Sequence, residues 1–85
     1  MTVVLSKLAQ KQIKKLDNST RKIIIDFLSV IEKLENPRSR GKALIGNFRG
    51  FWRYRVGDYR ILCKINDGEL VINIIKVAHR REIYD

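Results

Sequence analysis

The sequence is poor in the residues that most often carry enzyme chemistry. It has one cysteine, Cys63, and one histidine, His79, which excludes an internal disulfide and a zinc site built from cysteine and histidine. No close pair of acids suggests a two-metal centre, and no glycine-rich loop leads into a helix. We therefore expect neither a metal nor a cofactor. Cys63 stands among apolar residues, which predicts a small buried hydrophobe.

Long apolar runs and acidic residues are also scarce. No stretch approaches the ~20 apolar residues that a membrane-spanning helix needs, and the N-terminus lacks a secretory signal pattern. These absences predict a soluble protein of the cytoplasm. Nine Asp and Glu stand against 18 Lys and Arg, a net charge of +9. Such an excess favours a nucleic acid or an acidic protein as partner, the alternative being a merely solvated basic surface.

The apolar pattern predicts one small domain over residues 1–85. Ser6 and the pair Asn18-Ser19 are N-cap signals, and Pro37 ends the second helix. The expected elements are a strand over residues 2–5, helices over about 6–17 and 20–35, a loop over 37–50, and strands over 51–56, 59–65 and 70–78. This order predicts an α+β fold, β-α-α-β-β-β, with a curved, mainly antiparallel four-stranded sheet and a helical hairpin on one face.

The stretch Phe51–Leu62 alternates aromatic or aliphatic residues with arginines and breaks at Gly57-Asp58. This pattern is typical of a β-hairpin with a two-residue turn. Counting outward from the turn predicts the pairs Val56–Tyr59, Arg55–Arg60, Tyr54–Ile61, Arg53–Leu62 and Trp52–Cys63. Three guanidinium groups then share one face, although like charges directly opposite cost roughly 0.2–1 kcal/mol. We expect these arginines to bind an anion.

A second turn is predicted at Asp67-Gly68, again with two residues. Counting from it pairs Ile65 with Leu70, Cys63 with Ile72 and Ile61 with Ile74. In this register the residues that share the side of Arg60 are Asn73, Ile75, Val77 and His79.

Cleavage of RNA suits such a face because it needs no metal. The ribose 2′-hydroxyl can attack the adjacent phosphate when the phosphorane charge is neutralised and protons are transferred. Guanidinium forks match phosphate oxygens, and they favour the less positive form of a neighbouring tyrosine or histidine. Tyr84 and His79 therefore become candidate proton-transfer groups.

The run Trp52–Ile61, Trp-Arg-Tyr-Arg-Val-Gly-Asp-Tyr-Arg-Ile, together with Val77–Tyr84, Val-Ala-His-Arg-Arg-Glu-Ile-Tyr, resembles the RelE branch of the RelE/ParE toxins. These are the toxins of type II toxin–antitoxin modules in prokaryotes. The resemblance implies cleavage of mRNA in the ribosomal A site, with a 2′,3′-cyclic phosphate product and inhibited translation. It also implies a cognate antitoxin that wraps around the toxin, and a toxin–antitoxin complex that binds its own operator DNA.

By the same resemblance, Arg60 would stabilise transition-state charge and Tyr84 would transfer a proton or activate the 2′-oxygen. Arg53, Arg55 and Arg80 would orient phosphate. For the last strand two candidates stay open, since strand alternation favours His79 and the motif favours Arg80. Further basic residues that would bind substrate, along the loop and the hairpin, are Lys42, Arg49, Arg53 and Arg55.

Two rival functions remain open from the residues alone. A ParE-like inhibitor of DNA gyrase would share the fold but act by binding a protein. A non-catalytic RNA-binding module would bind RNA and form no product.

Overall fold

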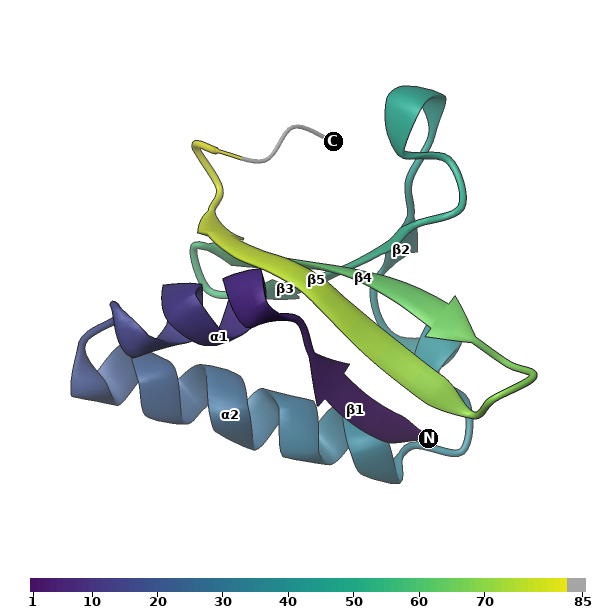
Figure 1. Ribbon diagram of the computed structural model, residues 1–85, viewed down its shortest axis with the longest axis horizontal. Coiled ribbons are helices and arrows are strands. Elements are labelled where there is room, and N and C mark those ends of the chain that lie inside the picture. The colour runs from purple at the N-terminus through teal and green to yellow at the C-terminus, as the bar shows by residue number, and fades with distance from the viewer. Residues whose placement is uncertain (83–85) are drawn as a thin grey trace.

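The computed structural model describes residues 1–82 as two helices packed on one face of a single sheet (Figure 1). The helices are α1 (Lys7–Lys14) and α2 (Asn18–Lys33). The strands are β1 (Thr2–Leu5), β2 (Lys42–Ala43), β3 (Trp52–Val56), β4 (Tyr59–Asn66) and β5 (Val71–His79), and the 3-10 turns are η1 (Pro37–Ser39) and η2 (Gly46–Phe48). The predicted α+β fold is confirmed, and every predicted helix and strand forms in the predicted order.

The sheet has the strand order β1-β5-β4-β3-β2. Only β1 and β5 run parallel, and the other neighbours are antiparallel. The sheet therefore has one more strand than the four expected, because β2 forms within the segment predicted as loop. The nearly all-apolar β5 lies between β1 and β4, as expected of a central strand.

Side chains bind the free backbone groups at both ends of helix α1. The Ser6 hydroxyl accepts a hydrogen bond from the Ala9 amide at 3.0 Å, which confirms the predicted N-cap. Helix α1 ends at Lys14, earlier than predicted, and Arg21 of α2 donates to the carbonyls of Ile13 and Lys14. A guanidinium there satisfies orphan carbonyls and complements the helix dipole.

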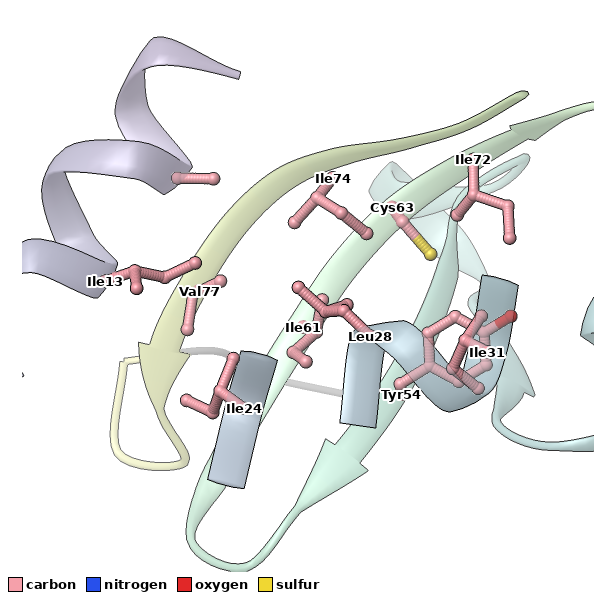
Figure 2. Close-up of a cluster of buried hydrophobic side chains, with 11 residues drawn as sticks. Ile13, Ile24, Leu28, Ile31, Tyr54, Ile61, Cys63, Ile72, Ile74 and Val77 are labelled. Carbon is pink, nitrogen blue, oxygen red and sulfur yellow. The ribbon is translucent and has the colours of Figure 1, made fainter. Parts of the chain in front are cut away.

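The core lies between the helices and the sheet (Figure 2). Ile24, Leu28 and Ile31 of α2 are buried against the sheet, while Ile23 is more than half exposed. The fully buried sheet residues are Tyr54 of β3, Ile61 and Cys63 of β4, and Ile72 and Ile74 of β5. These residues face the helices. Their neighbours along each strand, the arginines among them, point to the opposite side of the sheet.

The first hairpin has the predicted register in all five pairs, from Val56–Tyr59 to Trp52–Cys63. Gly57 adopts φ +56° at the first turn position. A two-residue hairpin turn of the II′ class requires a positive φ there, and only glycine adopts it at low cost. The prediction succeeds because turn and alternation are both encoded within twelve consecutive residues.

The second hairpin does not have the predicted register. Asn66 pairs with Val71, so residues 67–70 form a four-residue turn in which Leu70 has φ +57°. The Asn66 side chain bonds the Glu69 amide and carboxylate, and Arg38 holds Asp67 from outside. These contacts favour the longer turn, which moves each partner by two residues and keeps the same side of the sheet.

A β-bulge in β5 then reverses the sides. Cys63 pairs with Ile74 but Leu62 pairs with Lys76, so one extra residue, Ile75, is inserted. Helix α1 supports the bulge, because the Ser6 hydroxyl donates to the Ile75 carbonyl at 2.8 Å. The Gln12 carbonyl Oε1 likewise accepts the Val77 amide at 2.7 Å. Beyond this point every residue of β5 faces opposite to the prediction.

Candidate nucleic-acid interface

Basic side chains gather on the face of the sheet that the helices leave uncovered. Cross-strand partners point to the same side, so the register assigns each residue to a face. We use the name basic face for the cationic residues on this side: Lys42, Arg53, Arg55, Arg60, Lys64, Lys76 and Arg80. In Figure 1 the loop around η2 and the yellow end of the described chain both rise from this side of the sheet.

Together with Arg53, Arg60 is one of two largely buried cations of the basic face. It is only 9% exposed, and its Nη1 donates to the carbonyls of Gly57 and Tyr59 at 3.1 and 3.2 Å. Within residues 1–82 these bonds engage one nitrogen, leaving Nε and Nη2 able to donate to a ligand. Burial lowers the pKa of this guanidinium, and the charges of Arg55, Arg53 and Arg80 lower it further.

The neighbours of Arg60 differ in exposure. Arg55 stands directly opposite Arg60 and is exposed, whereas Arg53 is only 7% exposed. Lys42 of β2 is paired with Arg53, so the unexpected fifth strand adds a cation to the same face. Like charges this close repel one another, and a bound anion relieves that repulsion.

The prediction that His79 shares the face of Arg60 is wrong. His79 pairs with Tyr59, and the two rings meet edge to face at 5.5 Å between centroids. It lines a hollow on the helix side together with Leu8 and Gln12. The physical reason is the bulge at Ile75, which inverts the alternation.

Arg80, one residue later, therefore lies on the basic face. Its amide continues the ladder by donating to the Asp58 carbonyl at 2.7 Å, and its Nη1 is 3.8 Å from the Asp58 carboxylate. Its charge is among those that lower the pKa of Arg60. The structure thus brings together Arg53, Arg55, Arg60 and Arg80.

Sequence reasoning missed Lys76. In the predicted register Lys76 faces the helices, but it is paired with Leu62 and lies on the basic face. Only knowledge of the bulge would have placed Lys76 on this face, and the bulge has no local sequence signature here. Arg49 lies as expected on the exposed loop after η2.

Arg38 and Arg40, two basic residues of the segment predicted as loop, have partners within the described chain. Arg38 forms two 2.9 Å bonds with the Asp67 carboxylate, which lower the pKa of that acid. The Arg40 guanidinium lies 5.9 Å from the centroid of the Phe27 ring, and its carbonyl accepts the Trp52 indole N–H. These contacts tie residues 38–40 to the helix side and to the second hairpin turn.

The buried thiol of Cys63 and the buried phenol of Tyr54, both on the core side, are held in their neutral forms. Burial raises the pKa of the Cys63 thiol to about 12, so it stays protonated, and its Sγ lies against the Trp52 carbonyl. Burial also raises the pKa of Tyr54, whose hydroxyl donates to the Pro37 carbonyl. Cys63 is the buried hydrophobe that the sequence predicts.

The described residues contain neither a metal-binding cluster nor a helix able to span a membrane. Residues 1–82 hold no cluster of three or more His, Cys, Asp or Glu side chains placed to bind a metal ion. Over the same residues, neither helix is long and apolar enough to cross a membrane. Tyr84, the candidate proton-transfer group, lies outside the described residues.

Comparison with known proteins identifies the family. The model of the family described as the ParE toxin of the type II toxin–antitoxin system, parDE, matches residues 3–84. The chain belongs to this RelE/ParE family of toxins. The resemblance to the RelE/ParE toxins, stated from the hairpin and the last strand, is thereby confirmed at the level of the family.

Relatives of known structure share the fold of this RelE/ParE toxin along its length. A chain of the toxin–antitoxin complex RelBE2 from Mycobacterium tuberculosis superposes with a TM-score of 0.84 at 28% identity, covering 93% of this chain and 96% of that one. A chain of the archaeal RelE-RelB complex from Pyrococcus horikoshii gives 0.76 at 26% identity, covering 96% and 97%. A curated relative, Toxin RelE of Mycobacterium tuberculosis, is 39% identical over 51 residues. That match spans 60% of this chain and about half, 53%, of the curated relative.

Proposed function

We propose that this toxin is a ribosome-dependent, metal-independent endoribonuclease that cuts mRNA in the ribosomal A site. The observation that carries the proposal is the convergence of Arg53, Arg55, Arg60 and Arg80 on one open face. A curated relative is named Toxin RelE, and the resemblance attaches mRNA cleavage to that branch. In this proposal the toxin inhibits translation, and it therefore acts in the prokaryotic cytoplasm, where the ribosomes are.

The reaction divides among the arginines of this face and Tyr84. The 2′-oxygen attacks phosphorus as it loses its proton, the bond to the 5′-oxygen breaks, and that oxygen gains a proton, leaving a 2′,3′-cyclic phosphate. Arg60 binds the phosphorane oxygens through Nε and Nη2, since Nη1 is held by the turn carbonyls. Arg55 and Arg80 hold the flanking phosphates. Tyr84 performs one of the two proton transfers, which an arginine cannot perform, and solvent water performs the other.

A cognate antitoxin is part of the same proposal. The solved complexes of relatives are named as RelBE2 and as RelE-RelB toxin–antitoxin pairs. We infer that an antitoxin of this kind covers the toxin through its basic and apolar surfaces. The resulting complex binds its own operator DNA.

Inhibition of DNA gyrase is the second candidate function. The matching family model carries the description of a ParE toxin, which favours it. The arginine group argues against it, because inhibition by protein binding does not need four guanidinium groups gathered on one open face.

Primer extension on a defined mRNA in a translating extract tests the proposal. New 5′ ends should form only with ribosomes, and Arg60→Ala should slow their formation roughly 10²–10³-fold, the usual loss for one transition-state donor. Lys22→Ala is the matched control, since it removes one cation from the helix side, where Lys22 pairs with Asp26. Intact mRNA together with inhibited supercoiling by gyrase would overturn the proposal in favour of the second candidate.

A further inference from the structure

Two aromatic rings stand next to the basic face without belonging to the core. Phe48 ends the turn η2 and is 40% exposed, and Phe51 directly precedes β3. Their rings meet edge to face with 6.5 Å between centroids and 77° between planes. An exposed ring and a half-buried ring placed together beside cations suggest a binding surface.

The loop that carries these rings is held by its own backbone. The Phe51 amide donates to the Phe48 carbonyl at 3.0 Å, and the Leu44 amide donates to the Phe51 carbonyl at 3.1 Å. Leu44 is buried and anchors the loop, and Gly46 and Gly50 adopt positive φ. The rings are therefore presented on a closed turn, which lowers the ordering cost of binding.

The rings also lie on the side of the sheet that carries the arginines. Phe51 precedes Trp52, a core-side residue, so alternation places it with Arg53. Lys64, on the basic face, has its Nζ 5.7 Å from the centroid of the Phe51 ring. A flat apolar surface and a cation within this distance match the two halves of a nucleotide, its base and its phosphate.

The spacing to the proposed reaction site suits a bound strand. Lys64 and Arg60 lie on one side of β4, four residues apart, which is about 13 Å at ~3.3 Å per residue. A stacked nucleic-acid strand rises ~3.4 Å per nucleotide, so the distance corresponds to about four stacked nucleotides, or fewer in a stretched strand.

We propose that Phe48 and Phe51, with Lys64, form a stacking platform for a nucleobase of single-stranded RNA a few nucleotides from the phosphate bound at Arg60. This inference rests on the proposed function and extends it from the reacting phosphate to the flanking strand. Stacking is tolerant of sequence, so the platform contributes affinity and register rather than recognition of one base. An acidic antitoxin segment would pair with Lys64 alone, whereas a nucleobase would use the planar ring beside the ammonium as well.

Fluorescence of 2-aminopurine tests the platform directly. The probe is a short 2′-O-methyl oligoribonucleotide, which cannot be cleaved, with one 2-aminopurine whose fluorescence stacking quenches. We expect quenching by the wild type, none by Phe48→Ala, and a Kd about 5- to 100-fold weaker for that variant. Phe48→Trp should restore both. Ile45→Ala is the matched control, because Ile45 is a 79% exposed apolar side chain on the same loop.

Three results would overturn the platform: no quenching by the wild type, equal quenching by Phe48→Ala, or weakened antitoxin binding with RNA binding unchanged. Replacing the probed base with an abasic site should erase the difference between wild type and Phe48→Ala. Failure of the proposed function looks different, since quenching would persist while ribosome-bound mRNA stayed intact. Because Phe48 is exposed, thermal unfolding of Phe48→Ala should match the wild type and exclude misfolding.

Discussion

Gly41 lies in close contact with β3, and replacing it by alanine tests the packing that holds β2 in place. It adopts φ +85°, and a Cβ there would lie 2.4 Å from Trp52 Nε1 and 2.6 Å from the Arg53 carbonyl oxygen. The indole cannot move away freely because its N–H donates to the Arg40 carbonyl. The Arg53 carbonyl belongs to the backbone of β3. Gly41→Ala must therefore displace the sheet edge.

The expected loss combines two separate costs. A left-handed backbone costs a non-glycine residue ~1–2 kcal/mol, and overpacking costs ~1–3 kcal/mol. The sum, roughly 2–5 kcal/mol, is a large part of the ~4–13 kcal/mol expected for a domain of this size. Gly50→Ala is the matched control, since Gly50 has φ +95° but a Cβ there meets nothing within 4 Å. The free energy of unfolding of Gly50→Ala should therefore fall only by the backbone cost, ~1–2 kcal/mol.

Urea unfolding of the two variants measures the difference. We expect Gly41→Ala to be less stable than Gly50→Ala by ~1–3 kcal/mol at an unchanged m-value. Equal losses for the two variants would refute the close approach, and with it the account of how β2 joins the sheet.

Three further predictions concern single contacts. Tyr54→Phe leaves the buried Pro37 carbonyl without its donor and should cost ~1–3 kcal/mol in urea unfolding. Gln12→Ala removes the acceptor of the Val77 amide at the bulge, so hydrogen exchange at Val77 should accelerate more than at the other amides of β5. The raised pKa of Cys63 stabilises the fold fully below the unfolded thiol pKa, and this contribution is lost as pH rises from about 9 toward about 12. Unfolding free energies of Cys63→Ala should therefore fall less over that pH range than those of the wild type, and identical slopes would contradict the assignment.

The sequence determines those parts of the fold that local patterns encode. The hairpin at Gly57-Asp58 follows from a turn and an alternation that lie side by side in the chain, and all five pairs are confirmed. The second hairpin depends on distant partners. Arg38 holds Asp67 in the longer turn, and Ser6 binds the bulge from 69 residues away. Such contacts have no local sequence signature, so the face of His79 was predicted wrongly.

The same reasoning explains the partial prediction of the site. Arg53, Arg55 and Arg60 were placed correctly because they belong to the local hairpin. Lys76 was missed because its side depends on the bulge. The proposed role of Tyr84 remains a prediction from the resemblance.

Comparing Arg80→Ala with His79→Ala is the measurement that tests the account most directly. The two residues are adjacent in the chain, and the bulge places them on opposite faces of the sheet. Single-turnover cleavage of mRNA on programmed ribosomes should slow roughly 10- to 100-fold for Arg80→Ala, the loss expected for one charge-assisted hydrogen bond to a flanking phosphate. His79→Ala should keep the wild-type rate once its thermal unfolding shows that it is folded. The reverse outcome, with the rate lost in His79→Ala and kept in Arg80→Ala, would contradict the basic face as the site of phosphate chemistry.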